Sequence, residues 1–203
     1  YMIATSEHPL TSMYMGETIP IEMLPLKIVG VSPCFRREVG SHGQSDLGIW
    51  RVHQFTKIEQ IVISTPEQSW EIHEELLQNC IDLWNELGLH YEVVNICTGD
   101  MGTVAARKYD LEAWLPGAGQ YKEIVSCSNC TDYQANRLQI KYGQPGHANQ
   151  PIVHTLNSTA VATSRALVAI IEQNQLADGR VSIPEPLVPL MGGQTILEPC
   201  SWG

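Results

Sequence analysis

The pattern of apolar and polar positions predicts strands that alternate with helices. The segment Thr65 to Gln68 has the residue types of a helix start, and apolar side chains then recur at helical spacing up to Gly88, which suits a helix end. Alternation with a period of two predicts strands at Tyr91 to Cys97, Tyr109 to Leu115, Tyr121 to Cys127, Leu138 to Tyr142 and Ile152 to Leu156. The pattern therefore indicates an α+β fold, in which one largely antiparallel sheet has helices on one side.

A polar hairpin is predicted between Phe35 and Glu59, with a Gly-containing loop at residues 41–49. Because alternate side chains of a strand share a face, Arg36 is expected beside Glu38. The face of the returning strand carries Arg51, His53, Phe55, Lys57 and Glu59. An arginine fork fits a carboxylate or a phosphate, and an exposed aromatic ring stacks on a base. An ordinary amphipathic hairpin is the alternative, but this composition suits a nucleotide and a small acid.

A last long helix is predicted from Thr155 to Ile171, and its only charged residue is Arg165. Such an apolar helix should be largely buried, and an unpaired buried guanidinium is costly, so a partner is expected. One alternative is a salt bridge to an acidic residue of the sheet. The other is the phosphate of a bound nucleotide, and the residues alone leave both open.

Composition limits the possible classes of protein. The 203 residues are 43% hydrophobic, which suits a single domain with one sizeable core. The 22 acidic and 12 basic residues give a formal net charge of −10, and no basic stripe of the kind that grips nucleic acid appears. The longest apolar run, Ala166 to Ile171, is too short for a membrane span, and no leader is evident. We expect a soluble, cytoplasmic protein without a membrane partner.

The cysteine pattern does not favour a metal site. Cys127 and Cys130 form a single CxxC without a second ligand pair, so free thiols in a reducing compartment are expected rather than zinc. Asp100 and Asp132 are acidic but lie near expected helix starts, where capping explains them better than metal binding.

Several segments resemble the seryl-tRNA synthetase family of class II aminoacyl-tRNA synthetases. The hairpin is similar to the second signature motif of that class, in which FRxE, a variable loop and RxxxF follow one another. Similar segments occur in order at Thr5 to Thr11, Asn95 to Gly102, Ser126 to Arg137, His154 to Arg165 and Leu197 to Cys200. The resemblance implies the class II catalytic fold over residues 1–203. It also implies ATP-dependent activation of L-serine and transfer to tRNA(Ser), with tRNA(Sec) as a further acceptor.

By the resemblance, Arg36 and Arg165 are the catalytic residues. Arg36 would bridge the serine carboxylate and the α-phosphate, Phe55 would stack under adenine, and Arg165 would close the other face and contact the γ-phosphate. The expected ATP-binding residues are Arg36, Arg37, Glu38, Val52, Phe55, Glu123, Ile124, Val125, Ser126 and Arg165. Glu123 and Ser126 would also hold Mg²⁺. Because residues three apart in a flat strand face opposite ways, a bulge or strand end must separate this pair, or one of them acts indirectly.

The resemblance also implies a serine pocket. Its expected residues are Thr5, Ser6, Glu7, Arg36, Glu59, Asn157 and Thr159. Thr5 and Glu7 share a face if their segment is extended, and they would receive the ammonium group. Glu59 would contact the ammonium and the hydroxyl, and Thr159 the hydroxyl. Without the family, the polar residues Thr5, Asn157 and Thr159 would pass as turn or capping residues.

Two parts of the family pattern are absent from these residues, namely an N-terminal coiled coil that grips tRNA and a first motif that forms the dimer interface. We therefore expect the chain to be the C-terminal part of a longer, homodimeric protein. An arm-less ligase that loads an amino acid onto a carrier protein, with a metal held by Cys, Glu and Cys, is one alternative. A non-catalytic paralogue is another, but it should have lost Arg36, Phe55 or Arg165.

Overall fold

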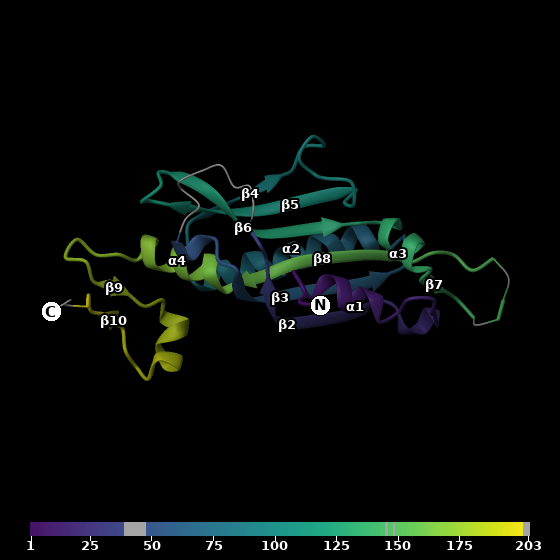
Figure 1. Cartoon of the computed structure of the whole chain (residues 1–203), viewed down its shortest axis with the longest axis horizontal. Coiled ribbons are helices and arrows are strands. Elements are labelled where there is room, and N and C mark those ends of the chain that lie inside the picture. Colours follow the sequence, from purple (N-terminus) through teal and green to yellow (C-terminus); the bar gives the residue numbers. More distant parts are fainter. Residues whose placement is uncertain (39–47, 145, 148, 201–203) are drawn as a thin grey trace.

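The chain folds around a six-stranded sheet in a computed structural model that describes residues 1–38, 48–144, 146–147 and 149–200 (Figure 1). The helices are α1 (Glu7–Ser12), α2 (Ser69–Glu86), α3 (Tyr133–Leu138) and α4 (Thr163–Gln173), with the 3-10 turns η1 (Ile21–Met23), η3 (Gly48–Trp50) and η4 (Glu185–Met191). The strands are β1 (Thr18–Ile19), β2 (Leu26–Phe35), β3 (Gln54–Ser64), β4 (Tyr91–Asn95), β5 (Arg107–Leu115), β6 (Gln120–Asn129), β7 (Lys141–Tyr142), β8 (His154–Ala162), β9 (Val181–Ser182) and β10 (Ile196–Leu197).

The main sheet has the strand order β2-β3-β8-β6-β5-β4, and all of its neighbouring strands are antiparallel. Two small sheets accompany it, one from β1 and β7 and one from β9 and β10. The predicted α+β class and the largely antiparallel sheet are therefore confirmed. Strand β8 lies in the interior of the sheet, although it comes late in the sequence, and it joins the β2-β3 hairpin to the β4-β5-β6 meander.

Helix α2 covers one face of the sheet. The predicted capping box is formed, because the Gln68 amide donates to Thr65 Oγ1 at 3.4 Å and the Thr65 amide donates to Gln68 Oε1 at 3.5 Å, although the regular helix begins at Ser69. The buried face of α2 presents Ile72, His73, Leu76, Leu77, Cys80 and Trp84. All of these except His73 pack with apolar side chains of the strands, such as Val62 and Leu111, into the main core.

The second face of the sheet is polar at its centre and carries helix α1. Gly30 of β2 lies so close to α1 that a Cβ there would meet Ser6 Oγ and the Leu10 side chain at 2.7 Å. Gln60 points toward α2, where its amide donates to the Leu76 carbonyl, whereas Glu59 points to the opposite face. Helices therefore lie on both faces, and the expectation of helices on one side only was wrong.

Residues 155–162 form strand β8, not the first half of the predicted helix. The segment is rich in Thr, Ser, Val and Ala, which suit either state, and two neighbouring strands that satisfy both of its edges decide for a strand. Helix α4 begins only at Thr163. It is also less buried than expected, because Leu167 is 45% exposed.

The segment 138–142 also differs from its prediction as one strand. Helix α3 ends at Leu138, and Gln139 takes a left-handed conformation with φ of 56° that stops the helix. Only Lys141–Tyr142 is a strand, paired in parallel with β1. The local alternation of apolar residues was too short to distinguish the end of a helix from a strand.

The predicted hairpin exists, but its strands lie further from the loop. Strand β2 ends at Phe35 and β3 begins at Gln54, so Arg36, Glu38 and Arg51 lie outside the strands. Glu38 has a positive φ of 51°, which is incompatible with an extended strand. The expected alternation of Arg36 and Glu38 was therefore wrong. Most of the predicted loop, residues 41–47, lies outside the described residues.

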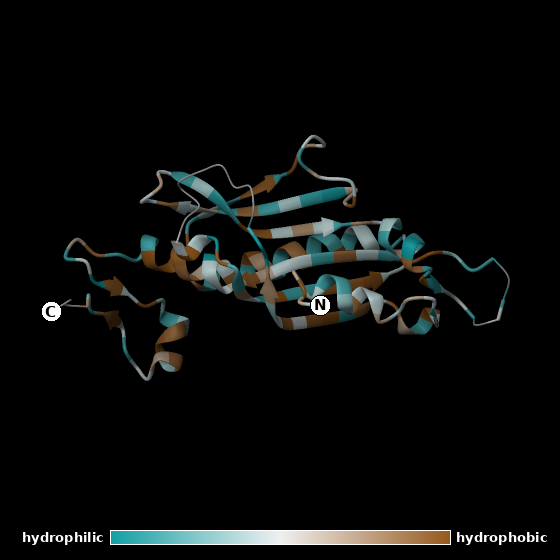
Figure 2. Ribbon diagram, viewed as in Figure 1, coloured by the Kyte–Doolittle hydropathy of each residue, from teal (hydrophilic) through white to brown (hydrophobic). Residues whose placement is uncertain are grey.

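Residues 174–200 form an extension that ends in the β9-β10 hairpin. The η4 turn connects these two strands; Figure 2 shows it as largely hydrophobic, and its Leu190 is 81% exposed. Among the helices of the described ranges, none is long and apolar enough to cross a membrane.

Candidate active site

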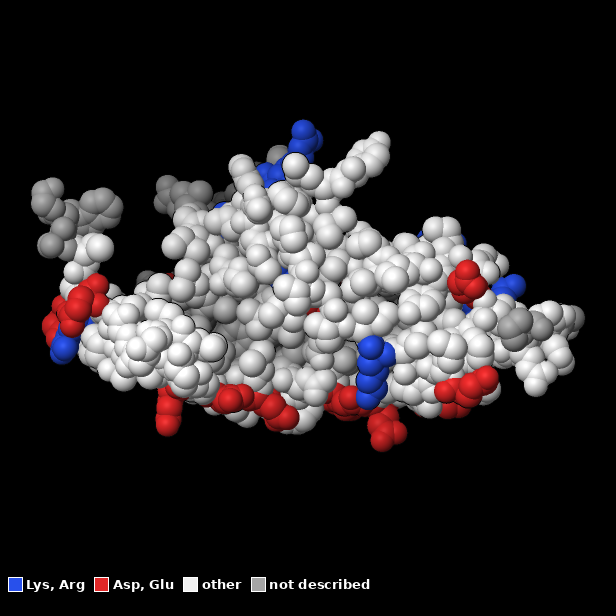
Figure 3. All heavy atoms as spheres, turned by 90° about the horizontal axis from the view of Figure 1, so that it is seen from below, with Lys and Arg blue, Asp and Glu red and all other residues white. Residues whose placement is uncertain are grey.

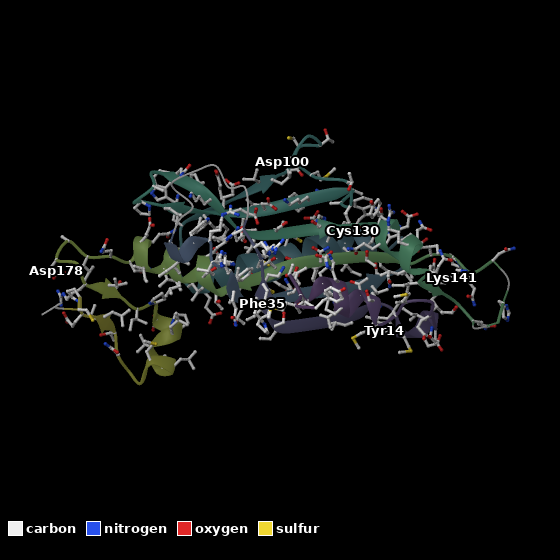
Figure 4. All side chains as sticks on the ribbon, in the orientation of Figure 1. Tyr14, Phe35, Asp100, Cys130, Lys141 and Asp178 are labelled. Atoms are coloured by element: carbon white, nitrogen blue, oxygen red, sulfur yellow. The ribbon has the colours of Figure 1, made fainter. Side chains whose placement is uncertain are left out.

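A polar cavity lies on the face of the sheet opposite α2. It is lined by the predicted ligand residues Arg36, Glu38, Val52, Phe55, Glu123, Ile124, Thr159 and Arg165, together with Trp50, Arg51, Lys57, Ala162 and Ser164. Figure 4 shows nitrogen and oxygen atoms gathered over the middle of the sheet, between the labelled Phe35 and Cys130. The fold thus brings residues from the hairpin, β6, β8 and α4 to one place.

Arg36 and Phe55 form one wall of this cavity. The Arg36 guanidinium lies 5.3 Å from the centre of the Phe55 ring, and its Nε donates to the Ala4 carbonyl at 3.3 Å. The Arg36 amide donates to the His53 carbonyl, so the hairpin ladder continues for one step beyond the strands. These contacts orient the guanidinium but do not neutralise it. An anionic ligand would complete its coordination.

Glu38 forms an ion pair with Arg51, and their closest atoms are 2.7 Å apart. Both residues line the cavity, and the pair fixes the start of the loop against its end. Arg37 is exposed and is not among the lining residues. The expected ATP contacts of Glu38 and Arg37 remain predictions.

Arg165 lies at the opposite wall, and its position bears on the two alternatives for its partner. Its Nη1 donates to the Glu123 carbonyl at 2.8 Å and to Glu123 Oε1 at 3.1 Å, and the guanidinium lies 5.4 Å from the Trp50 ring centre. The salt bridge to the sheet is therefore present. Because the two side chains are 23% and 43% exposed and line the cavity, the pair is open to solvent and to ligands. Trp50 is an aromatic wall that the sequence reasoning missed.

Of the alternatives for the pair Glu123 and Ser126, the structure shows the bulge. Leu111 is paired with Val125 and Glu112 with Glu123, which leaves Ile124 as the extra residue in β6. Asp110, which is two residues from Glu112, is paired with Ser126. Since Asp110 and Glu112 share a face of β5, the Glu123 and Ser126 side chains also share that face.

The oxygen donors at this bulge fit Mg²⁺. Asp110, which the sequence reasoning did not single out, is 4% exposed, and its buried Oδ1 has no hydrogen-bond partner among the described residues. Burial raises the Asp110 pKa, and nearby Glu123 raises it further, while Lys108 at 3.1 Å opposes this. Mg²⁺ prefers one or two carboxylates together with phosphate oxygens and water. The set Asp110, Glu123 and Ser126 offers that chemistry.

Glu59 is buried and contacts two residues that line the cavity, Lys57 and Thr159. Lys57 Nζ is 2.5 Å from Glu59 Oε2, and Thr159 Oγ1 donates to the same oxygen at 3.3 Å. Burial raises the Glu59 pKa, and Lys57 lowers it. The predicted residues Glu59 and Thr159 are thus in direct contact, which places a carboxylate and a hydroxyl beside each other.

Glu7 comes to the same face from α1. Its Oε1 accepts from Gln134 Nε2 at 2.6 Å and from Asn157 Nδ2 at 3.2 Å. Glu7 is the first residue of a helix, so the condition under which Thr5 and Glu7 would share a face, an extended segment, is not met. Thr5 instead accepts the Glu7 amide at 3.3 Å, while Thr5 and Ser6 are buried. Gln134 gave no signal in the sequence, because only the packing of α3 brings it here.

Cys127 and Cys130 point to different surroundings. The Cys127 thiol faces α2 and the His73 carbonyl, whereas the Cys130 thiol contacts Asn157 Nδ2 at 3.4 Å on the cavity side. Burial raises the pKa of both thiols, that of Cys130 to about 12. In the described part of the chain, no three His, Cys, Asp or Glu side chains are grouped so that they could hold a metal ion.

Comparison with known proteins places this geometry in a family. The chain is 60% identical to the serine–tRNA ligase of Methanocella arvoryzae over 194 residues, which are 95% of this chain and 46% of that protein. It is 58% identical to the serine–tRNA ligase of Archaeoglobus fulgidus over 188 residues, or 92% of this chain and 42% of that protein. The chain thus spans less than half of the length of these curated relatives.

Two solved structures are similar as well. The seryl-tRNA synthetase from Pyrococcus horikoshii complexed with ATP has a TM-score of 0.94 and 53% identity, covering 98% of this chain and 44% of that chain. The cytoplasmic serine–tRNA ligase from Naegleria fowleri in complex with AMP has a TM-score of 0.92 and 47% identity, covering 98% and 47%. Residues 1–174 match the tRNA synthetase class II core domain (G, H, P, S and T) family. The chain therefore belongs to the class II tRNA synthetase core-domain family.

Proposed function

We propose that the protein is a serine–tRNA ligase, which activates L-serine with ATP and transfers the seryl group to tRNA(Ser). The observation that carries this proposal is the junction of two kinds of site on one sheet face. Arg36, Phe55 and Arg165 offer a guanidinium and aromatic cavity for a nucleotide. Directly beside it, Glu59 and Thr159 offer a buried pair for a small polar substrate.

In the first step, the serine carboxylate oxygen forms a bond to the α-phosphorus of ATP, and the bond from that phosphorus to the bridging oxygen breaks, which releases pyrophosphate. Arg36 would hold the two anions together and stabilise the charge that develops between them. Phe55 and Arg165 would fix the adenine and the γ-phosphate. In the second step, a terminal ribose hydroxyl of tRNA attacks the seryl carbonyl and AMP leaves.

Magnesium, which neutralises and orients phosphates when bound, would be held by Glu123 and Ser126 beside Asp110. The Arg165–Glu123 pair is then part of the proposal, because a nucleotide would draw Arg165 onto phosphate and free the Glu123 carboxylate. The present contact between them accordingly suits a site that exchanges one pairing for another.

The remaining partners follow from the same proposal. A homodimer and a cytoplasmic location are proposed from the similarity to the seryl enzymes. Figure 3 shows one face of the molecule, on which Lys and Arg side chains are scattered and Asp and Glu side chains line an edge. That face offers no basic stripe for tRNA, so we propose that tRNA contacts the rim of the cavity and other parts of the natural protein.

The test is pyrophosphate exchange into ATP by the full natural protein that carries this sequence, with serine, threonine, alanine or glycine as substrate. We expect exchange with serine to exceed that with alanine or glycine by about 10²-fold or more, because unpaired polar groups in the pocket penalise substrates without a hydroxyl. Equal or greater exchange with glycine or alanine would instead favour the carrier-loading ligase. Absence of exchange with every amino acid would favour a non-catalytic role.

A further inference from the structure

Lys57 is a buried cation to which the proposed reaction gives no role. Its Nζ lies 2.5 Å from Glu59 Oε2, and the two side chains are only 8% and 2% exposed. Burial of an ion pair costs desolvation energy that its attraction often fails to repay, so stability alone does not explain the pair. Lys57 also lines the cavity, which puts the pair at the place where a substrate would bind.

Glu59 and Glu7, two of the carboxylates on this face, differ in their partners. Glu59 has a cation, Lys57, and a hydroxyl donor, Thr159, and both contact its Oε2. Glu7 has only the amide donors Gln134 and Asn157 among the described residues, so its negative charge is not neutralised. A zwitterionic amino acid with a hydroxyl side chain, such as serine, would bring one cation, its ammonium group, and one hydroxyl to this pair.

We propose that Lys57 is a positioning residue that divides the work between these carboxylates. Lys57 holds Oε2, which keeps Glu59 ionised and fixes its orientation. Oε1 of Glu59 then remains as the acceptor for the hydroxyl of the amino acid. Because Glu59 is already neutralised, the ammonium goes to Glu7. This inference rests on the proposed function and deepens it, since it assigns the choice of a hydroxyl-bearing substrate partly to a residue that does not touch it.

The charged and titratable groups around Glu59 set the expected pH dependence. Lys57 comes from the same strand, Glu7 from α1 and the Cys80 thiol from α2, while Gly30, which faces Glu59 on β2, has no side chain. Burial and Glu7 raise the Glu59 pKa, and Lys57 lowers it. Removal of Lys57 therefore moves the pKa further upward, so that Glu59 is protonated at pH values where it is ionised in the wild type.

The experiment compares wild type, Lys57→Met and Lys57→Arg in the full natural protein that carries this sequence, by pyrophosphate exchange between pH 6 and 9. We expect Lys57→Met to lower kcat/KM for serine by about 10²-fold at neutral pH. The activity of this variant should recover at alkaline pH, where Glu59 ionises again, since each unit of pKa shift changes the ionised fraction about tenfold. KM for ATP should change less than about twofold, because the lost interaction affects the binding of the amino acid and not that of ATP. Lys57→Arg should restore most of the activity. Lys27→Met, which removes an exposed lysine paired with Glu75, is the matched control.

Two results of the exchange assay would overturn the proposal: identical pH profiles of wild type and Lys57→Met, or an equal loss for ATP and serine, which would make Lys57 a phosphate contact. Melting temperature against pH gives a test that needs no activity. When folding raises the pKa of a carboxyl group, that group stabilises the folded state at pH values below its unfolded pKa. This stabilisation is lost as the pH rises through the folded pKa. Lys57→Met should therefore melt progressively lower with rising pH than wild type, and Lys57→Met/Glu59→Gln should not. A pH-independent difference would refute the idea even if the wild type shows no exchange.

Discussion

The two faces of the central sheet are built from the same strands but do different work. Toward α2 the strands present Val62, Leu111 and other apolar residues to Trp84, which is fully buried. Toward the cavity they present Lys57, Glu59, Asp110 and other polar groups, several of which are also buried. Because alternate side chains of a strand point to opposite faces of the sheet, each strand contributes residues to both faces. Burial of the apolar face stabilises the fold and offsets the free-energy cost of burying polar groups on the other face.

The largest effect is expected on the apolar face. Trp84→Ala should lower the free energy of unfolding by about 3–5 kcal/mol, because it leaves a large cavity between α2 and the sheet and strands the Ala160 carbonyl that Trp84 Nε1 contacts at 3.3 Å. Denaturant unfolding measures this. Trp70→Ala is the control on the same helix, because Trp70 is 45% exposed and its loss should cost no more than about 0.5 kcal/mol. Similar losses for both would remove the distinction between the faces.

On the polar face, Arg36→Lys should lower the rate of serine activation by about 10²–10³-fold while the melting temperature stays unchanged. Lysine cannot span a carboxylate and a phosphate with a planar fork, and loss of one preorganised donor costs this much in comparable sites. Pyrophosphate exchange at saturating ATP and serine is the measurement. Arg180→Lys, which alters a surface arginine paired with Asp178, should leave the rate intact. Unchanged turnover in Arg36→Lys would make this arginine structural.

A smaller effect is expected for the hydroxyl beside Glu59. Thr159→Val keeps the shape but removes the donor to Oε2, and it should reduce the preference for serine over alanine by about 10-fold, which corresponds to one hydrogen bond to a charged group. The ratio of kcat/KM for the two amino acids reports it. Thr18→Val, at a threonine bonded to Gln150 in the small β1-β7 sheet, is the control. A preserved ratio in Thr159→Val would separate Thr159 from substrate choice.

Only a small change in stability is expected for Arg165→Leu. Its pair with Glu123 is partly exposed, so the loss should cost no more than about 1 kcal/mol in the protein without nucleotide. ATP with magnesium should raise the melting temperature of the wild type and not of the variant, as mass action requires for a ligand of the folded state. A steep loss of stability without ATP would mean that Arg165 serves the fold and not a nucleotide.

Much of the fold was predictable because its signals are local. The capping box of Thr65 and Gln68, the helical spacing along α2 and the alternation in β4, β5 and β6 all depend on neighbours in the sequence. The bulge in β6 was one of the alternatives that the spacing of Glu123 and Ser126 left open, and the structure selects it. Strand β8 was not, because its small and β-branched residues suit two states and only its neighbours on both edges select one.

The sequence by itself determined the elements that local pattern specifies, and its motifs identified several of the side chains that line the cavity, such as Arg36, Phe55 and Arg165, but not Trp50. Only the tertiary structure decided how those side chains are paired. Arg165 pairs with Glu123, and Glu7 with Gln134, across segments that are far apart in the sequence, at distances that no local pattern contains. Lys57 and Glu59 share a strand face by local alternation, but their burial as an ion pair depends on the fold. The physical reason is that charge and hydrogen bonding depend on distance and burial in space. The sequence fixes these quantities only through the fold as a whole.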